Sequence, residues 1–321
     1  MGSACRELGD DLYTRNAMIA HISPAPLVYL VVLNWNGYAD THECLESLRG
    51  LAYPNYRVFV VDNASGDDSP ARIAADHPEA ELHRCAHNLG IAAGYNVGIQ
   101  IALQRGADYV VPMNNDLDCD PLFVTQMIAT QRANPGCGIV MPKIFYYAER
   151  DRIWSAGAYN RWMPSNIVMR GRKQHDGPAF AADTEIQFAP SCCLLLTREL
   201  AEVVAFDEGY FFYYDDWDFC VQARTAGYRI MYSAGARLWH KVSRSTKNSP
   251  KSLRWWTVFG QSCVRYHRKH HSLRLLAVYV AWVLFRESVK GNVRSLPSFL
   301  SGVRIALRAK LDDDPRAGWS N

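Results

Sequence analysis

The segment Leu27-Val-Tyr-Leu-Val-Val-Leu33, followed by Asn34-Trp-Asn-Gly37, indicates the fold class. Seven apolar residues without a polar interruption are typical of a strand buried on both faces, as in a parallel sheet covered by helices. After the polar loop, apolar residues recur at helical spacing between positions 44 and 51. This segment therefore predicts a buried strand, a loop and a helix.

The same order repeats twice along the chain. Arg57–Val61 runs into Asp62-Asn63, and Tyr109–Met113 runs into Asn114–Asp118, with helical patterns between them. Alternation of strands and helices at roughly 30 residues per unit predicts an α/β domain with a mostly parallel, Rossmann-like sheet. Because such sheets bind ligands beyond the carboxyl ends of their strands, we expect the site where these polar residues gather.

The remaining chain predicts a second half and an extension. Short pieces between 140 and 200 indicate a β-rich excursion, after which the aromatic loop Tyr210–Tyr214 enters a helix at Asp215. Tyr228–Tyr232 is expected to form the last strand. The predicted parts are a leader (1–26), an α/β domain (27–245, with one half at 27–120 and the other at 140–245) and a basic, aromatic helical extension (246–321).

Charge is distributed unevenly over the 321 residues. The formal net charge is +3, yet residues 241–310 hold 15 Lys and Arg against one acid, Glu287, so the rest of the chain sums to −11. An acidic body with a basic tail points to an anionic partner of the tail. The hydrophobic share of 49% is globular and excludes disordered and fibrous classes.

Cysteine usage and the apolar runs bear on the compartment. The nine cysteines form no CxxC pair and are odd in number, so neither a structural zinc site nor a secreted disulfide framework is expected. The first eleven residues are polar and acid-bearing, unlike a signal peptide. The longest apolar stretch, Leu275–Phe285, is shorter than the roughly 20 residues of a membrane-spanning helix. These features predict a cytoplasmic protein.

Two acidic clusters carry candidate chemistry. Asp116 and Asp118 follow a buried strand and suit Mg²⁺ or Mn²⁺, which prefer one or two protein carboxylates; the alternative is an acidic helix start before Pro121. Asp215, Asp216 and Asp218 lie within four residues, and their repulsion is expected to raise a pKa toward the range of a general base. Their alternative is an acid-rich first helical turn. We expect the preceding aromatic residues to form a wall around these acids.

Two common nucleotide motifs are missing. The glycine-rich stretch Asn88–Gly98 lacks the GxGxxG spacing, and no GxxxxGK[ST] occurs in the sequence. Dinucleotide binding and P-loop chemistry are therefore disfavoured. No nucleic-acid module is visible either, and the acidic body would repel a phosphate backbone.

Several blocks occur in one order and resemble family 2 glycosyltransferases, especially the rhamnosyltransferase-like branch of bacterial polysaccharide assembly. The blocks are Leu33-Asn-Trp-Asn-Gly37, Val61-Asp-Asn-Ala-Ser-Gly-Asp67, Asn88-x-Gly-x-Ala-x-Gly-x-Asn-x-Gly98, Asn114-Asn-Asp116, Phe206-Asp-Glu208, Tyr214-Asp-Asp-Trp-Asp-Phe-Cys220 and Ala226-Gly-Tyr-Arg-Ile230. The resemblance covers about residues 27–245. It implies a GT-A fold and an inverting, metal-dependent transfer from a nucleotide-diphosphate sugar, with UDP or dTDP as the leading nucleotides.

Residue roles follow from the resemblance by position. It implies Asp216 as the catalytic base and Asp116 as a metal ligand, with His240 reaching the metal or the diphosphate. The implied acceptor-side residues are Asp215, Trp217 and Asp218. The implied nucleotide-sugar-binding residues are Leu33, Trp35, Asp62, Asn88, Gly90 and Asn115.

Some positions depart from the family pattern. Asp215 replaces a glutamate and is one methylene shorter, and Pro190-Ser-Cys-Cys193 stands where a glycine is usual. Asn114 also takes the place of an acid in the metal motif, as this branch often has it. Acceptor identity is therefore not transferred from the family.

The basic tail fits the implied reaction. Its aromatics, short apolar run and cations predict helices lying on an anionic membrane surface, at the cytoplasmic face of the cell membrane, where related enzymes act on lipid-linked or glycan acceptors. The alternative is a core helix with solvated cations, and a homo-oligomer is also compatible with the tail. Rival functions are an inactive GT-A scaffold at a membrane and, less favoured, a sugar-phosphate nucleotidyltransferase, which would need a cationic loop where Asn34–Gly37 stands.

Overall fold

The computed structural model describes residues 25–161, 166–242 and 253–309. The predicted leader (1–26) lies almost wholly outside the described residues. The strands are β1 (Val28–Asn34), β2 (Tyr56–Asp62), β3 (Glu81–Arg84), β4 (Tyr109–Asn114), β5 (Leu117–Cys119), β6 (Cys137–Tyr146), β7 (Ile153–Ser155), β8 (Ala158–Asn160), β9 (Ile167–Met169), β10 (Thr184–Glu185), β11 (Leu195–Thr197) and β12 (Arg229–His240). The helices are α2 (Tyr38–Arg49), α3 (Ser69–Asp76), α4 (Gly90–Gln104), α5 (Phe123–Ala133), α6 (Arg198–Val203), α7 (Asp215–Thr225), α9 (Leu253–His270), α10 (Leu273–Val289) and α11 (Leu296–Arg308), with short 3-10 turns η1 (Pro178–Phe180) and η2 (Val293–Ser295).

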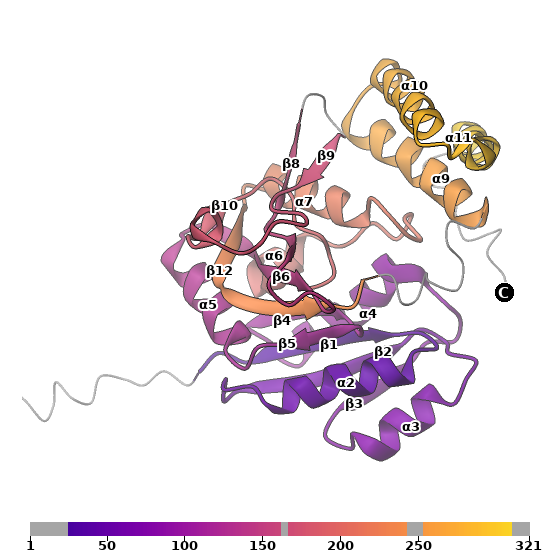
Figure 1. Ribbon diagram of the computed structural model, residues 1–321. Helices are drawn as coiled ribbons and strands as arrows, with labels where there is room; N and C mark the ends of the chain where they lie inside the picture. The colour runs from indigo at the N-terminus through magenta and orange to yellow at the C-terminus, as the bar shows by residue number, and fades with distance from the viewer. Residues whose placement is uncertain (1–24, 162–165, 243–252, 310–321) are drawn as a thin grey trace, which may run out of the picture.

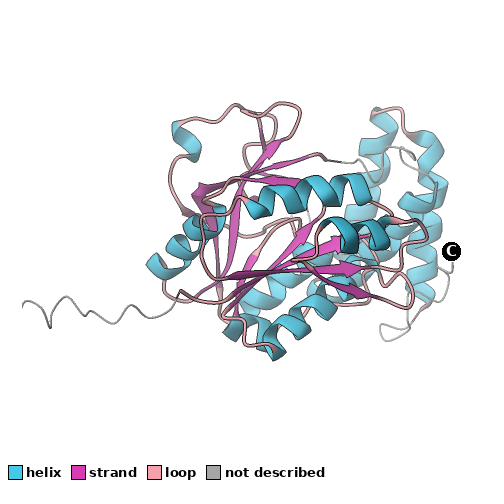
Figure 2. Ribbon diagram, turned by 90° about the horizontal axis from the view of Figure 1, so that it is seen from below, coloured by secondary structure: helices cyan, strands magenta, loops and turns pink. Residues whose placement is uncertain are grey.

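The main sheet has the order β10-β12-β6-β11-β4-β1-β2-β3, with β5 on β12 and β7 on β6. β4, β1, β2 and β3 are parallel neighbours, and so are β6 and β12, while β11 runs antiparallel between the two blocks. Helices cover both faces of this sheet (Figures 1 and 2). The predicted α/β, mostly parallel architecture is confirmed.

Glycines let α4 pack closely on the centre of the sheet. A Cβ added to Gly98 would lie 2.2 Å from Val31 Cγ1, and one added to Gly94 would lie 2.7 Å from Leu33 Cδ1. The glycine-rich stretch that lacks a dinucleotide motif therefore serves helix–sheet packing, with its glycines one helical turn apart.

The C-terminal helices stack together at one side of the α/β body, which is formed by residues 25–242 (Figure 2). α9 and α11 cross closely at two glycines, because a Cβ on Gly302 would lie 2.0 Å from Thr257 O and one on Gly260 would lie 2.4 Å from Phe299 O. α9 also buries Val264 and Tyr266 in an apolar cluster with Tyr210 and Tyr214 of the body. The predicted helical extension is confirmed, and it packs on the body. No helix in the described part of the chain is long and apolar enough to cross a membrane.

Candidate active site

The carboxyl ends of β1, β2 and β4 lie side by side. Asn34 at the end of β1 pairs in register with Asp62 at the end of β2, and Leu33 pairs with Asn114 of β4. The polar residues that follow the three strands therefore meet at one sheet edge, where parallel sheets bind ligands.

Asp62 stabilises this edge of the sheet through hydrogen bonds of its buried carboxylate. Its side chain is fully buried, and its carboxylate accepts hydrogen bonds from Asn34 Nδ2 (2.8 Å), Ser65 Oγ (2.5 Å) and the Ser65 amide (3.1 Å). Asp62 thus shapes the turn that follows β2. Leu33 and Trp35 flank Asn34; Leu33 packs on the core, and Trp35 is 51% exposed, which leaves its ring open to a planar ligand.

Asn88 and Gly90 join the β2 loop to the start of α4. Asn88 Oδ1 accepts hydrogen bonds from Asn63 Nδ2 (3.0 Å) and the Gly90 amide (2.9 Å). Gly90 has φ +80°, and a Cβ there would lie 2.8 Å from Phe211 O, so the position requires glycine. Asn88 and Gly90, which were predicted to bind the nucleotide sugar, thus connect the edge of the sheet to the aromatic loop.

Asn115 holds the loop after β4 against α2. Its Nδ2 donates to Thr41 Oγ1 (2.8 Å), which donates in turn to Asn34 Oδ1 (2.8 Å). Tyr95 OH donates to Asn114 Oδ1 (2.7 Å) from α4. The amide side chains of this motif are therefore fixed before any ligand binds.

Asp116 and His240 meet although 124 positions separate them in the sequence. β5 pairs antiparallel with β12, with Leu117 opposite His240, so Asp116 Oδ1 lies 3.1 Å from His240 Nε2. Both residues are buried, and the Trp154 ring contacts the imidazole edge-on, with the ring centroids 4.9 Å apart. Burial alone would raise the pKa of Asp116, but the nearby imidazole outweighs it and holds that pKa below its usual range.

The Asp116–His240 pair has the donor atoms of a divalent-cation site. Among the described residues no hydrogen-bond donor is aligned with Asp116 Oδ1, and His240 Nδ1 also lacks a partner. A buried carboxylate oxygen without a hydrogen bond is unfavourable unless a cation or a ligand satisfies it. Carboxylate and imidazole together suit Mn²⁺, and the carboxylate suits Mg²⁺, so the predicted ligands fit the predicted metals.

Asp118, the other acid considered for the metal, points elsewhere. Its carboxylate lies 2.7 Å from the Arg150 guanidinium at the surface, so it is already paired with a cation. Asp116 is therefore the acid of this loop that belongs to the site.

Asp215 and Asp216 begin α7 after two strained residues. Tyr213 and Tyr214 have φ values of +66° and +65°, which L-residues rarely adopt. Ser191 Oγ donates to Asp215 Oδ2 (3.2 Å), and burial raises the pKa of Asp215 to about 6. Burial, together with the charge of Asp215, also raises the pKa of Asp216, so one carboxyl of the pair is prepared to hold a proton.

The segment after Ser191 connects the acid pair to the metal motif. Cys192 O accepts a hydrogen bond from the Asn114 amide (2.9 Å). Burial raises the pKa of the Cys192 thiol, and the charges of Cys193, Asp116 and Asp216 raise it further. Both acidic clusters therefore lie near this segment, and the structure brings the predicted base and the predicted metal ligand to one site.

Asp218 does not join Asp215 and Asp216 in the site. Its side chain is fully buried and faces α9, where it pairs with Lys269 Nζ (2.8 Å) and His270 Nε2 (2.6 Å). Tyr210 OH (3.3 Å) and Gln222 Nε2 (2.6 Å) occupy its remaining acceptor positions. The structure thus differs from the acceptor-side prediction, because the carboxylate is fully used in docking α9.

Two tyrosines of the aromatic loop contact the C-terminal helices. Tyr214 OH lies 2.9 Å from Tyr279 OH of α10, and Tyr213 OH accepts a hydrogen bond from Trp255 Nε1 of α9. Tyr210 packs in the same cluster, but its hydroxyl also reaches Asp218. The expected wall around the carboxylates is therefore wrong for the hydroxyl ends of Tyr213 and Tyr214, which hold the C-terminal helices. Trp217 stays at the rim, edge-on to Phe188 with ring centroids 5.6 Å apart.

Sequence reasoning missed three residues beside the predicted ones: Ser191, Trp154 and Lys241. Lys241 is buried and pairs with Asp40 (2.8 Å) and Glu43 (2.7 Å) of α2. Its position directly after His240 was the available signal. Ser191 lies in the segment 190–193 that departs from the family pattern, which was its signal, whereas Trp154 lies in no recognisable pattern.

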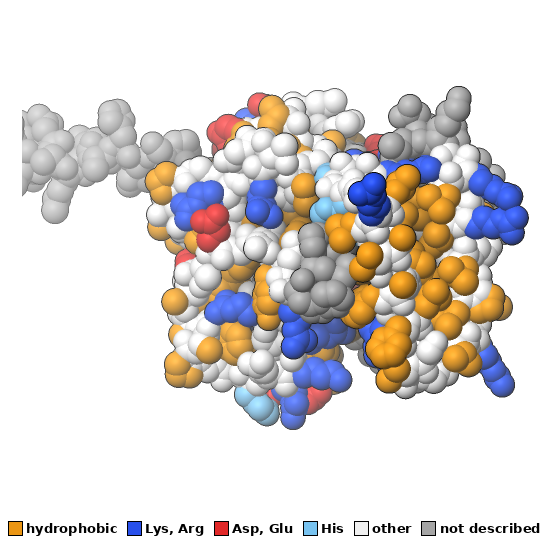
Figure 3. All heavy atoms as spheres, turned by 90° about the horizontal axis from the view of Figure 1, so that it is seen from above, with side chains coloured by type: hydrophobic (Ala, Val, Ile, Leu, Met, Phe, Trp, Pro, Cys, Tyr) orange, Lys and Arg blue, Asp and Glu red, His pale blue; other side chains and the backbone are white. Residues whose placement is uncertain are grey.

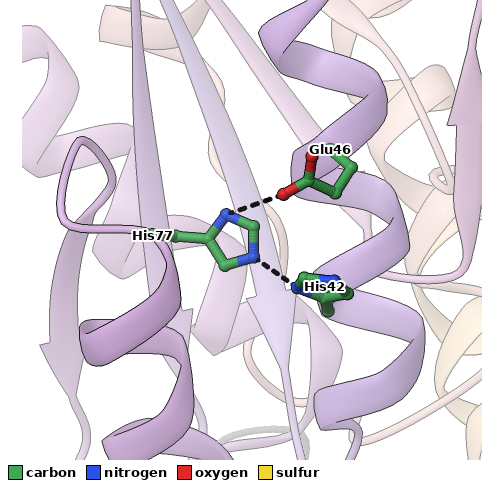
Figure 4. A group of neighbouring side chains, drawn as sticks. All are labelled: His42, Glu46 and His77. Carbon is green, nitrogen blue, oxygen red and sulfur yellow. Dashed lines mark hydrogen bonds and ion pairs between the residues drawn. The ribbon is translucent and has the colours of Figure 1, made fainter.

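A second group of possible metal ligands lies between α2 and the end of α3. His42, Glu46 and His77 turn their side chains toward one another (Figure 4). His77 Nε2 is hydrogen-bonded to His42 Nδ1 at 2.8 Å, and Glu46 is paired with Arg49. His77 Nδ1 lacks a hydrogen-bond partner among the described residues, so this group also offers an unsatisfied nitrogen to a cation, but its carboxylate is already paired with Arg49.

Asp116→Ala tests the metal ligands. Loss of a direct ligand should weaken Mn²⁺ binding by about 100-fold or more, since loss of even an indirect partner commonly costs 10- to 100-fold. Titration of the protein with Mn²⁺ under electron paramagnetic resonance measures this. Asp118→Ala is the matched control and should bind Mn²⁺ as the wild type does; equal losses in both variants would refute the assignment.

Asp218→Asn tests the docking of α9. Lys269 and His270 lose a charged partner, so the free energy of unfolding should fall by about 1–3 kcal/mol. Chemical denaturation measures it. Asp216→Asn, in the same helical turn, should leave stability unchanged or raised, because burial and Asp215 penalise the charge of Asp216; a similar fall in both variants would contradict the docking role.

Several known proteins are similar to this chain. A rhamnosyltransferase of Mycobacterium tuberculosis, N-acetylglucosaminyl-diphospho-decaprenol L-rhamnosyltransferase, is 26% identical over 219 residues, which are 61% of this chain and 69% of the relative. Among solved structures, GalNAc-T7 with UDP, GalNAc and Mn²⁺ superposes with a TM-score of 0.56 at 13% identity over 74% of this chain, which spans 48% of the GalNAc-T7 chain.

A second solved structure covers more of the chain. The mannosyltransferase PcManGT of Pyrobaculum calidifontis, in complex with GDP-Man and Mn²⁺, superposes with a TM-score of 0.54 at 17% identity, over 94% of this chain and 83% of PcManGT. These likenesses confirm the GT-A fold. Residues 29–204, more than half of the chain, match the model of glycosyl transferase family 2. The chain therefore belongs to glycosyl transferase family 2 and is a glycosyltransferase.

Proposed function

We propose that this glycosyltransferase moves a sugar from a UDP- or dTDP-linked donor to a hydroxyl of a glycan or lipid-linked acceptor, with inversion. The observation that carries the proposal is that two pairs lie near the Ser191–Cys192 segment: Asp116 with His240 (3.1 Å), beside the Asn114 amide that donates to Cys192 O, and Asp215, which accepts from Ser191 Oγ, with its neighbour Asp216. One pair suits a leaving diphosphate and the other suits the removal of a proton.

The donor half is residues 27–120. The exposed ring of Trp35 would stack on the nucleobase of the donor. The amide side chains around Asn115 are already held in place by hydrogen bonds where the sugar nucleotide would bind. Asp116 and His240 would hold Mg²⁺ or Mn²⁺. When bound, such a cation supplies charge neutralisation at the leaving diphosphate.

Asp216 acts as the general base from the acceptor half, residues 140–245. It takes the proton of the acceptor hydroxyl while that oxygen attacks the anomeric carbon on the face opposite the leaving diphosphate. Burial and the charge of Asp215 raise its pKa, which strengthens it as a base. A single displacement inverts the sugar and requires no nucleophile of the enzyme.

The surface of the C-terminal helices is an argument for a lipid-linked acceptor at a membrane surface. Positions 273, 277, 281, 285 and 289 form one stripe along α10 that is exposed and apolar, and Phe285 (69%) and Val289 (72%) are its most exposed members. Hydrophobic side chains gather over these helices with Lys and Arg around them (Figure 3). This combination suits an anionic membrane surface, and the decaprenol-linked acceptor in the name of the mycobacterial relative is consistent with it.

Asp216→Asn tests the base. Transfer should fall by about 10²- to 10⁴-fold, the usual contribution of a general base, while donor affinity stays near that of the wild type. Steady-state kinetics and donor titration with Mn²⁺ separate the two effects. An equal loss of donor binding would place Asp216 on the donor instead, and unchanged transfer would show that Asp216 is not the base.

The pH profile is the second arm of this test. The base must be deprotonated, so kcat/KM should rise with pH, and the raised pKa of Asp216 places the rise above the range of an ordinary aspartate. Asp215→Asn removes the neighbouring charge and should move the rise to lower pH. A profile that Asp215→Asn leaves unmoved would contradict the coupling of the two carboxyls.

Phe285→Ser with Val289→Ser tests the membrane surface. Loss of two apolar side chains should weaken binding to anionic vesicles by about tenfold or more. Vesicle co-sedimentation measures it. Val203→Ser, which alters an equally exposed residue of α6, is the matched control; unchanged binding of the double variant would refute this part of the proposal.

A further inference from the structure

A cavity of about 800 Å³ lies between the β8–β9 hairpin, the start of α7 and α10. The hairpin rises beside the C-terminal helices in Figure 1. Four of its lining residues are arginines and none is an acid. The arginines are Arg161, Arg170, Arg172 and Arg286.

Two of these guanidinium groups are held in place by neighbours. Arg170 donates to Ala179 O and lies over the Phe180 ring at 5.1 Å, and Arg286 donates to Glu287 Oε1 (2.7 Å) and lies over the Trp282 ring at 4.5 Å. The other two, Arg161 and Arg172, are exposed.

Arg161 and Arg172 have no acidic partner within residues 25–161, 166–242 and 253–309. Arg286 is ion-paired with Glu287, whereas the other three arginines have no carboxylate partner among the described residues, so the cavity has a positive potential that attracts an anion. Guanidinium groups bind phosphate through paired hydrogen bonds, which makes a phosphate or diphosphate the fitting ligand.

The place of the cavity suggests which phosphate it receives. Trp217 lines the cavity and directly follows Asp216, so the cavity lies next to the proposed base. Arg286, on its other side, directly precedes Glu287 on α10 and follows Phe285 of the exposed apolar stripe. A ligand that spans the site from Asp216 to α10 therefore meets an acceptor position, then cations, then an apolar surface.

We infer that this cavity binds the diphosphate group of a lipid-linked sugar acceptor, with the sugar hydroxyl toward Asp216 and the lipid chain along α10. The inference rests on the proposed function. The donor diphosphate has its own place at Asp116 and His240, so the two diphosphates occupy separate sites.

The test is binding of farnesyl diphosphate to the full chain in EDTA, which keeps the ligand from binding through a metal at the donor site. Isothermal titration should show that the double variant Arg161→Ala, Arg172→Ala binds with a Kd about tenfold or more above that of the wild type. The reason is that losing a hydrogen bond to a charged group weakens binding by about this factor or more. Lys173→Ala, a neighbouring exposed cation outside the cavity lining, is the control and should leave the Kd unchanged. Melting temperatures of the variants should match the wild type.

Several outcomes would overturn the inference. One is an unchanged Kd in the double variant, and another is equal affinity for inorganic pyrophosphate, which would indicate a site for a small free anion. A third is lost binding to phosphatidylglycerol vesicles at unchanged farnesyl diphosphate affinity, which would indicate headgroup binding. The measurement needs neither donor nor turnover, so a protein that binds farnesyl diphosphate but transfers no sugar would refute the proposed function and leave the cavity assignment intact.

Discussion

The buried carboxylate of Asp218 is the constraint on which the arrangement of the candidate active site depends. A fully buried carboxylate persists only when it is paired, and the partners of Asp218, the Lys269 ammonium and the His270 ring, come from α9, about fifty residues further along the chain. Asp207 repeats the pattern: burial would raise its pKa, but Arg265 and Lys269 outweigh burial and hold that pKa low. Two cations of the basic tail, Arg265 and Lys269, therefore neutralise acids of the body.

The same docking holds the strained entry to α7. Left-handed conformations of Tyr213 and Tyr214 cost about 1–2 kcal/mol each, and they persist because their hydroxyl groups are bound by α9 and α10. Ser262 of α9 adds a hydrogen bond to Phe212 O (2.8 Å). The position of Asp215 and Asp216 is consequently set by helices that contain none of the catalytic groups.

Sequence patterns predicted what depends on short range. The buried strands, the polar residues at their ends and the start of α7 follow from periodicity and turn chemistry. Asp116 with His240 came from a family resemblance, because the β5–β12 pairing that joins them leaves no local signal. The role of Asp218 could not be predicted, since the spacing 215, 216, 218 shows that the acids share a helix but not which face meets another helix. The arginine-lined cavity escaped for a similar reason, as its cations come from separate segments that only folding brings together.

The ion pairs of Asp207 and Asp218 with α9 also determine when the site can form during synthesis of the chain. A nascent chain that has emerged only through position 245 contains every acid of the centre, yet Asp207 and Asp218 still lack the cations of α9. The loop before α7 then has no partner to hold its tyrosines in their strained form. The loop that positions Asp215 and Asp216 is held only after the helices that bear the exposed apolar stripe have been made, so the proposed transfer site and the proposed lipid-binding surface are completed together.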